Sequence, residues 1–308
     1  MINKDKKNPK VSVVIPVYNR AFMLEQVIHS LNAQSYPHME IIMVDDGSTD
    51  DSLKIMKQYP HIHALSQENR GPAGARNTAL KHAAGEIILF MDSDAIAPGD
   101  LVEIHVNAHL KHPGSIIQGQ VISIMDLNDA FKVPFSLRYY SRAFFATGNV
   151  SVHKSCIDAV GGFDDKVFRK GWEDLDLGLR LRKSGLKVRR LFSRGYVWHY
   201  EGNIRDKNSI RDYFEDRRGE GRAAVDFYRK HPYFSIKLMT MAGSFFFFLD
   251  RILFNEDYLE SERFHNKLLS LRDRGKKDAA AAKMQFAGYH FYLKGVQERI
   301  EEDGYLLP

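Results

Sequence analysis

The stretch VSVVIPVYN, Val11–Asn19, begins with β-branched residues and ends in a proline and a polar tip. Together with the helical pattern over about Phe22–Ala33, it predicts a strand followed by a helix. The same order then repeats, because the apolar run Ile41–Val44 leads into the polar segment Asp45–Asp50 and a further helical pattern. Continuous apolar strands that alternate with helices predict an α/β fold, with a mostly parallel sheet covered by helices on both faces.

The alternation continues to about residue 202. The expected elements are strands at His61–Leu65 and Glu86–Met91, helices at Ala75–Ala84 and Leu101–His112, strands at Ile116–Ile124 and Gly148–Val152, a helix at Trp172–Ser184, and a strand pair at Lys187–Leu191 and Tyr196–Tyr200. In such sheets ligands bind at the carboxyl ends of the strands. We therefore expect the polar segments after the first, second and fourth strands, Val17–Arg20, Asp45–Ser48 and Asp92–Asp94, to converge on one crevice.

Beyond about Asn203 the pattern becomes helical throughout. Long helical patterns cover Ile210–Arg229, Phe234–Phe254, Leu259–Arg272 and Ala279–Glu302. The apolar core Leu238–Leu249 has twelve residues, fewer than the ~20 that span a bilayer, so it is either a buried helix or an interfacial helix at a membrane or subunit contact. Phe245–Phe248 cannot all face one core, since successive helical residues are about 100° apart. We expect some of this aromatic surface to contact a membrane or a second copy.

Composition narrows the class of protein. The 308 residues are 44% hydrophobic and 27% charged, which excludes a disordered or fibrous chain as the main state. A single cysteine, Cys156, cannot form an internal disulfide, and the first 25 residues lack the apolar stretch of a signal peptide. We therefore expect a cytoplasmic protein, peripheral on the cytoplasmic face of the membrane if its C-terminal helices contact lipid. The net charge of +5 is too diffuse to imply nucleic-acid binding.

The segment Asp92-Ser93-Asp94 follows a buried strand, where an i, i+2 pair in extended backbone points both carboxylates to one side. Two such oxygens suit Mg²⁺ or Mn²⁺, which fill their other positions with water and ligand phosphates. The alternative is a solvated acidic turn before the helix that follows Pro98. The second acidic pair, Asp45-Asp46, favours the cation site, because crowded carboxylates need a cation or a donor ligand.

Two further segments suggest a ligand by their residue types. Gly71–Asn77 opens a helix with a glycine-rich backbone that allows close approach of an anion, and Arg76 adds a planar guanidinium. A plain helix start explains the loop equally well. His199 ends a strand, where it is either structural, a third metal ligand or a donor to a diphosphate. Arg217, Arg218 and Arg222 form either a solvated helix face or a phosphate clamp.

Trp172-Glu173-Asp174 begins the last helix of the alternating region. The two acids are ordinary residues for a helix N-terminus, where the macrodipole stabilises them. An adjacent indole suggests more, because an aromatic ring buries the apolar face of a sugar while acids bind hydroxyl groups or accept a proton. The basic residues that follow, seven between Arg180 and Arg194 with no acid among them, form a solvated surface or the site of an anionic acceptor.

Five segments in order make the chain resemble the family 2 glycosyltransferases, inverting sugar-nucleotide-dependent enzymes with the Rossmann-like GT-A fold. They are VSVVIPVYN at Val11–Asn19, IMVDDGSTD at Ile42–Asp50, NRGPAGARN at Asn69–Asn77, FMDSD at Phe90–Asp94, and GGFD at Gly161–Asp164 with GWEDLD at Gly171–Asp176. The last also resembles the acceptor-side segment of galactosyltransferase-like members. The resemblance implies a glycosyltransferase domain over 1–202, with a nucleotide-binding half at 10–112 and an acceptor-side half at 113–202. The helical pattern assigns residues 203–308 to a separate helical region.

The resemblance also implies roles for individual residues. Asp174 corresponds to the catalytic base, and Trp172 and Glu173 lie on the acceptor. Asp94, Asp92 and His199 resemble the metal-binding residues around the DXD motif. The nucleotide would be held by Pro16, Tyr18, Asn19, Asp46, Gly74, Arg76, Asp92 and Ser93. The implied cofactor is Mn²⁺ or Mg²⁺.

The implied reaction is a single displacement that moves a sugar from a nucleotide diphosphate sugar, with UDP favoured over GDP, to a hydroxyl of a glycan or lipid-linked acceptor. A sugar-nucleotide pyrophosphorylase is a rival, but it would carry its glycine-rich loop directly after the first strand, where this chain has Pro16–Asn19. A domain that binds a nucleotide or glycan without turnover is another, and the presence of Asp92, Asp94 and Asp174 argues against it.

Overall fold

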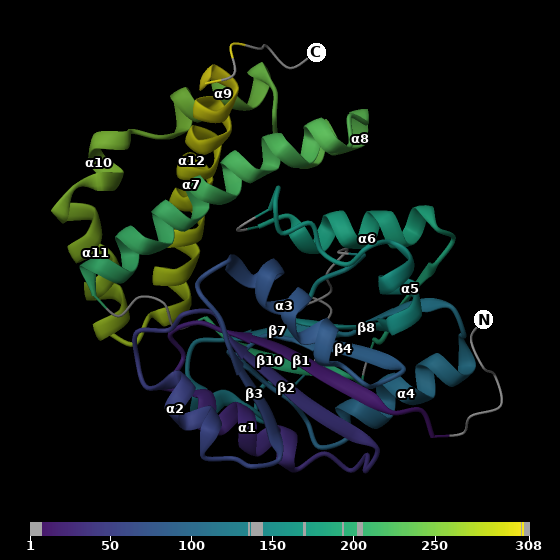
Figure 1. Ribbon diagram of the computed structural model, residues 1–308. Helices are drawn as coiled ribbons and strands as arrows, with labels where there is room; N and C mark the ends of the chain where they lie inside the picture. Colours follow the sequence, from purple (N-terminus) through teal and green to yellow (C-terminus); the bar gives the residue numbers. More distant parts are fainter. Residues whose placement is uncertain are drawn as a thin grey trace. The chain divides into compact units, whose positions relative to one another are not determined.

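The computed structural model describes residues 8–134, 136, 144–168, 171–192, 194–201, 206–302 and 304 (Figure 1). The chain forms two compact units. The first contains Met1–Arg169 and Glu173–Glu201, and the second contains Lys170–Trp172 and Gly202–Pro308. The boundary expected at residues 202 and 203 lies outside the described residues.

The first unit has alternating strands and helices. In chain order these are β1 (Val11–Val17), α1 (Leu24–Asn32), β2 (Met39–Asp45), α2 (Ser52–Lys57), β3 (Ile62–Ser66), α3 (Gly71–His82), β4 (Ile87–Met91), β5 (Ala95–Ile96), α4 (Leu101–Lys111), β6 (Ser115–Gln118), β7 (Gln120–Ile124), the 3₁₀ turn η1 (Leu127–Asp129), β8 (Asn149–His153), α5 (Lys154–Ala159), α6 (Glu173–Lys183), β9 (Lys187–Arg190) and β10 (Tyr196–Tyr200).

Within the described residues, the main sheet has seven strands in the order β3-β2-β1-β4-β8-β6-β9. Neighbouring strands are parallel except at β8, which is antiparallel to both β4 and β6. Side chains alternate between the faces of β1: Val13 and Ile15 pack with α1, α2 and α4, whereas Val14 packs with α3, α5 and α6. Figure 1 shows these two layers of helices, one on each face of the sheet. The predicted α/β fold is confirmed.

A three-stranded sheet, in the order β5-β10-β7, lies beside the main one and corrects two expectations. The expected strand Ile116–Ile124 is two strands, β6 and β7, and they belong to different sheets. Gly119 lies between the two strands. Asn149 and Gly195 approach it so closely that a Cβ there would lie 2.2 Å from Asn149 Nδ2 and 2.4 Å from the carbonyl oxygen of Gly195. The strands β9 and β10 do not pair with each other, since β9 joins β6 and β10 lies between β5 and β7.

The second unit is helical, as predicted for this part of the chain. Its helices are α7 (Lys207–Lys230), α8 (Phe234–Met239), α9 (Ser244–Leu253), α10 (Glu256–Glu260), α11 (Glu262–Asp273) and α12 (Lys277–Glu302). The expected helix Phe234–Phe254 is broken at residues 240–243, where Met241 has a φ of 51° and Gly243 is the extended N-cap of α9. Among the described residues, no helix is both long and apolar enough to cross a membrane.

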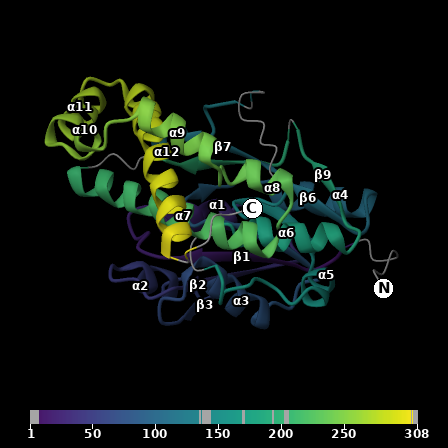
Figure 2. The same cartoon turned by 90° about the horizontal axis from the view of Figure 1, so that it is seen from above.

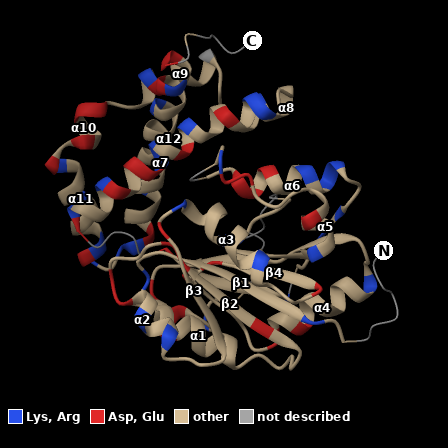
Figure 3. Cartoon of the chain, viewed as in Figure 1, with Lys and Arg blue, Asp and Glu red and all other residues tan. Residues whose placement is uncertain are grey.

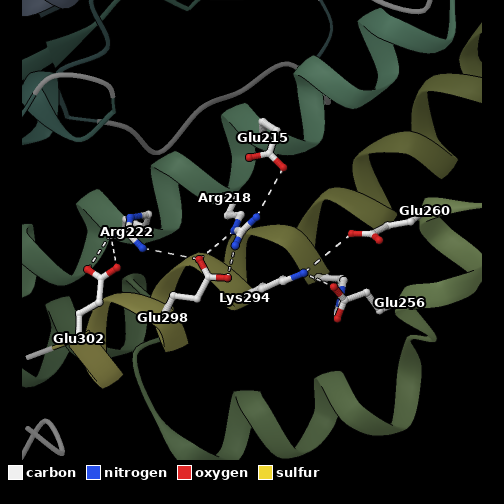
Figure 4. Close-up of polar contacts among 9 residues, drawn as sticks. Glu215, Arg218, Arg222, Glu256, Glu260, Lys294, Glu298 and Glu302 are labelled. Atoms are coloured by element: carbon white, nitrogen blue, oxygen red, sulfur yellow. Dashed lines mark hydrogen bonds and ion pairs between the residues drawn. The ribbon is translucent and has the colours of Figure 1, made fainter. Parts of the chain in front are cut away.

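The long helices α7 and α12 pack closely and exchange ion pairs. Arg218 binds Glu298, and Arg222 Nη2 lies 2.6 Å from an oxygen of Glu302 (Figure 4). Farther along α12, Lys294 binds Glu256 of α10. Of the arginines expected to form a solvated face or a phosphate clamp, Arg218 and Arg222 therefore hold carboxylates of a neighbouring helix, whereas Arg217 binds Glu220 of α7 itself. Figure 2 shows the two units from a second direction.

Candidate active site

The carboxyl ends of β1, β2 and β4 lie at the same edge of the sheet, because these strands are parallel neighbours. Their polar continuations also contact one another. Asn19, at the end of β1 with a φ of 52°, donates its backbone N–H to Ser48 Oγ, 2.9 Å away, and its Oδ1 accepts from the N–H of Thr49 at 2.8 Å. The expected convergence of these segments is present in the structure.

Asp94 lies between two cationic groups. One carboxylate oxygen is 3.0 Å from His199 Nε2, and the other is 3.1 Å from Arg20 Nη2. Burial alone would raise the pKa of Asp94, but His199 and Arg20 outweigh it and lower that pKa to about 2. Burial also opposes the charge of His199, yet Asp94 raises the histidine pKa to about 9. The two groups form an ion pair at neutral pH.

The pairing of β5 with β10 brings His199 to Asp94. His199 is opposite Ala95 in this antiparallel pair, and the backbone N–H of Tyr200 donates to the carbonyl of Asp94 at 2.8 Å. Asp92 completes a cluster, because it, Asp94 and His199 each offer one ligand atom within 4.8 Å of the others. Two carboxylates and an imidazole are a donor set that suits Mn²⁺, and Mg²⁺ favours their oxygens. The residues predicted to bind metal thus fit a divalent cation.

Arg76 is buried and connects the metal-binding candidates to α6. Its guanidinium donates to Asp92 Oδ1 at 3.0 Å and to Glu173 Oε1 at 3.1 Å. Among the described residues, neither Arg76 Nε nor Glu173 Oε2 has a hydrogen-bond partner, although both atoms are buried. Buried polar atoms are nearly always hydrogen-bonded. These two atoms therefore mark a place where a ligand can supply the missing donor and acceptor.

Asp174 lies in the first turn of α6, where acidic residues gather while basic ones occupy the last turn (Figure 3). Burial raises its pKa, the charge of Glu173 adds to the effect, and Arg76 only partly opposes it, so the pKa is about 7. Its neighbour Asp176 is fully buried and held by Arg180 at 2.7 Å. A carboxyl group with a pKa near 7 can accept a proton at neutral pH.

The residues predicted to hold the nucleotide occupy different environments. Asp46 is buried, and its Oδ1 accepts from Gln67 Nε2 at 2.6 Å and from the N–H of Arg70 at 2.9 Å. Tyr18 is 47% exposed, which leaves its ring available for stacking. Pro16 is half-buried, Ser93 is buried, and Gly74 is buried in α3, where a Cβ would lie 2.7 Å from Arg70 Cβ. Their roles in nucleotide binding stay predictions.

Trp172 belongs to the second unit, unlike the two acids that follow it. Its indole stacks on Phe227 with ring centroids 5.0 Å apart, and its Nε1 donates to the carbonyl of Glu220 at 3.0 Å. The backbone φ of Trp172 is 68°, a value that is uncommon for a residue other than glycine. An aromatic platform for an acceptor at this position stays a prediction, as does acceptor binding by Glu173.

Arg20 is the residue of this cluster that the sequence analysis did not single out. It directly follows Asn19 in the polar tip of the first strand, so its position was a signal that it reaches the same crevice. The pairing with Asp94 depends on two segments more than seventy residues apart, which no local pattern reveals.

The sequence matches the family described as Glycosyl transferase family 2 over residues 12–169. The chain belongs to this family. A protein of Bacillus subtilis strain 168, named as the uncharacterized glycosyltransferase YfnE, is 29% identical over 243 residues, which cover 58% of this chain and 62% of YfnE. The chain thus spans less than two thirds of that relative's length.

Solved structures share the fold at low sequence identity. The mannosyltransferase PcManGT of Pyrobaculum calidifontis, in complex with GDP-Man and Mn²⁺, has a TM-score of 0.61 at 17% identity, over 97% of this chain and 89% of that one. Residues 1–349 of S. aureus TarS, in complex with UDP, have a TM-score of 0.53 at 18% identity, over 96% and 92% of the two chains. The expected GT-A-type fold of family 2 glycosyltransferases is confirmed.

Proposed function

We propose that this chain is a metal-dependent, inverting glycosyltransferase that moves a sugar from a nucleotide diphosphate sugar to a hydroxyl acceptor, with Asp174 as the general base. The observation that carries the proposal is the position of Asp174 in the first turn of α6, the helix that Arg76 connects to Asp92. A pKa of about 7 suits Asp174 to this role. A general base works best when its pKa is near the working pH.

Each protein group has a part in a single displacement. Asp174 takes the proton of the acceptor hydroxyl as the oxygen attacks the anomeric carbon, which inverts the configuration there. Arg76 lies near enough to Glu173 and Asp92 to position both. It also contributes positive charge where the nucleoside diphosphate departs. Glu173 is proposed to contact the acceptor together with Trp172.

Asp92, Asp94 and His199 would hold the divalent cation, Mn²⁺ or Mg²⁺. When bound, such an ion supplies Lewis-acid stabilisation of the leaving diphosphate. Arg20 keeps Asp94 ionised, as a metal ligand must be. His199 would give up its proton to bind metal, so we expect cation binding to strengthen as pH rises.

A UDP-sugar is the proposed donor. The TarS complex contains UDP, whereas the PcManGT complex contains GDP-Man, so relatives of this fold use both nucleotides. Tyr18 would stack on the base and Asp46 would hydrogen-bond to it, with the other nucleotide-binding candidates around the phosphates. In this assignment residues 10–112 bind the nucleotide, residues 113–202 serve the acceptor, and residues 203–308 form a separate helical region.

The proposed acceptor is a glycan or a lipid-linked hydroxyl at the cytoplasmic face of a membrane. Contact through the C-terminal helices, with lipid or with a second copy, would bring the enzyme to such an acceptor. Exposed aromatic side chains on α9 support this part of the proposal.

The test begins with a screen of UDP- and GDP-sugars for nucleotide release, followed by the variant Asp174→Asn with the active donor. Transfer should fall by about 10²–10⁴-fold, the usual contribution of a positioned base. Calorimetry should show unchanged donor affinity in Mn²⁺ and weak binding in EDTA for both proteins. Asp158→Asn, an exposed acid of α5, is the matched control and should transfer at the parent rate.

Three outcomes contradict the proposal. Transfer by Asp174→Asn at the parent rate places the base elsewhere, and donor affinity that falls in proportion to the rate places Asp174 in the nucleotide site. Tight donor binding without release of nucleotide from any sugar donor identifies a binding domain without turnover.

A further inference from the structure

Helix α9 buries its acidic residue and exposes two of its aromatic rings. Its one acid, Asp250, is buried, and a carboxylate oxygen lies 3.0 Å from Nδ1 of the buried His290. Phe245 and Phe248, by contrast, are 64% and 62% exposed. A surface helix of a globular protein normally buries its apolar stripe and exposes its charges. The outward face of α9 therefore exposes apolar surface that a contact with a partner or a lipid would remove from water.

Helix α9 packs on the rest of its unit through the face opposite to the exposed rings. Phe246 and Phe247 pack against a core that includes Ala242 and Tyr292. The outward residues Phe245, Phe248 and Ile252 follow at spacings of three and four, which places them along one side of the helix. Leu253 adds to this side and is also exposed.

Helix α8 repeats the pattern directly before α9. Ile236 is buried, while Phe234 is 76% exposed and Leu238 and Met239 are also exposed. Residues 240–243 join the two helices and span at most about 14 Å when extended, so the adjoining ends of α8 and α9 lie near one another. We call the exposed set the α8–α9 face. It consists of Tyr233, Phe234, Leu238, Met239, Phe245, Phe248, Ile252 and Leu253.

The charged residues around this face indicate which kind of partner it can contact. From residue 227 to residue 249 the chain has no aspartate or glutamate but carries Lys230 and Lys237, and Arg251 is exposed on α9. Arg229 lies in the same stretch and is paired with Asp226 at 3.6 Å. A two-fold contact between copies would bring identical cationic surfaces together, which is unfavourable. Aromatic and aliphatic side chains with basic neighbours are instead typical of helices that lie in an anionic lipid interface.

We propose that the α8–α9 face inserts into the surface of an anionic lipid bilayer and holds the protein there as a peripheral membrane protein. Helices of six and ten residues are too short to span the bilayer, so they would lie in the plane of the interface. The contact needs neither donor nor metal. Only its consequence, access to a lipid-linked acceptor, rests on the proposed function.

The test is sedimentation of the full chain with vesicles, without nucleotide sugar and in EDTA. One set contains phosphatidylcholine with phosphatidylglycerol, and the other contains phosphatidylcholine alone. The parent should bind the anionic vesicles and bind them less at high salt. Phe245→Ser/Phe248→Ser should lower the partition coefficient by about tenfold or more, because each ring that enters the interface adds apolar burial.

A matched pair on α12 supplies the control. Phe286 and Tyr289 are 55% and 49% exposed at the same three-residue spacing, so Phe286→Ser/Tyr289→Ser should bind vesicles like the parent. Circular dichroism confirms that each variant is folded. The proposal is overturned if the parent does not bind anionic vesicles, or if the Phe245→Ser/Phe248→Ser variant binds them like the parent. A dimer that only this variant disrupts, without vesicle binding by the parent, identifies a subunit interface instead.

Loss of vesicle binding would leave the chemistry untouched. Sugar transfer to a soluble acceptor is measured on the same variants and should be unchanged. A failure of the lipid contact is therefore distinguishable from a failure of the glycosyltransferase assignment.

Discussion

At the scale of single residues, the first turn of α6 separates three acids by their partners. Glu173 is bound by Arg76, Asp176 is bound by Arg180, and Asp174 accepts a 2.6 Å hydrogen bond from the N–H of Leu175. A guanidinium stabilises a carboxylate far more than one backbone donor does when both are buried. For Asp174, burial and the charge of Glu173 outweigh the opposing charge of Arg76 and raise the pKa to about 7.

The raised pKa predicts that Asp174 destabilises the fold when it is ionised. The folded state keeps its proton up to about pH 7, whereas the unfolded state loses it near 3.8, so stability from this group is lost as pH rises between those values. Asp174→Asn should therefore melt about 5 °C or more above the parent at pH 8 and near the parent at pH 4.

Thermal unfolding in EDTA measures this effect apart from catalysis. The control Asp158→Asn should melt with the parent at both pH values. An equal difference between Asp174→Asn and the parent at pH 4 and pH 8 would show that the pKa of Asp174 is not raised.

At the scale of elements, local patterns predicted which segments form strands but not which strands pair. The alternating and apolar runs were sufficient to place strands at β9 and β10. Their assignment to different sheets depends on Asn149, whose Nδ2 donates to the carbonyls of Gln120 and Gly195. That contact joins three segments distant in sequence. The pairing of Asp94 with His199 could not be predicted either, because β5, which brings the two residues together, has only two residues and therefore no periodic pattern.

The helical pattern likewise concealed the break between α8 and α9. Periodic apolar residues continue through the segment, so the sequence predicted one helix. In the structure Thr240 turns its hydroxyl back to the carbonyl of Ile236, and the left-handed Met241 follows. A side-chain hydroxyl that competes for backbone groups weakens a helix at its end, but such a threonine is too common to predict a break.

Two glycines of α7 give an element-scale prediction. A Cβ at Gly221 would lie 1.9 Å from the carbonyl oxygen of Tyr292 in α12, whereas a Cβ at Gly219 would meet nothing within 4 Å. Gly221→Ala should therefore force the helices apart and destabilise the second unit by about 2–4 kcal/mol. Gly219→Ala should stabilise it by up to about 1 kcal/mol, because alanine favours the helix interior.

Urea unfolding followed by circular dichroism compares the two variants. The pair is matched, since both replace glycine by alanine two positions apart on one helix. Equal effects of the two substitutions would contradict the close contact of α7 with α12 at Gly221.

At the scale of the whole molecule, the sequence indicated a strand–helix part followed by a helical part, but it did not indicate the contacts within each part. Repeated strand–helix units lead to one core on each face of the main sheet, and five ordered motifs indicated the family that residues 12–169 match. The helical second unit has its own cores around α7 and α12. Apolar periodicity indicated these helices, but it carries no information on which charged residues meet across them.

Stability of the first unit should depend on two buried histidines of α4. His105 and His109 lie on either side of Ser151 Oγ, each at 2.8 Å, and His105 also contacts Asn149 Oδ1 at 3.0 Å. Burial lowers the pKa of His105 to about 4, and burial with the charges of His153 and His105 holds that of His109 well below 6.5. Both imidazoles are therefore neutral in the folded protein at neutral pH.

The sign of the resulting pH dependence follows from the unfolded chain, where a histidine gains its proton near pH 6.5. Below that pH the unfolded state binds protons that the folded state does not bind, so stability falls from pH 6.5 toward pH 4. His105→Gln removes this contribution and also loses native contacts, so it should be less stable than the parent at pH 7.5. The gap should narrow by about 2 kcal/mol at pH 5, which is 1.5 pH units below 6.5.

The two tryptophans allow this gap to be measured in the first unit alone, since Trp198 belongs to it and Trp172 to the second unit. In a Trp172→Phe background, urea unfolding followed by fluorescence reports on the surroundings of Trp198. His82→Gln, at an exposed position of α3, should leave the pH dependence of the parent unchanged. A gap between His105→Gln and the parent that stays constant from pH 7.5 to pH 5 would mean that His105 has the same pKa in the folded and unfolded protein, and that the contact with Ser151 does not require a neutral imidazole.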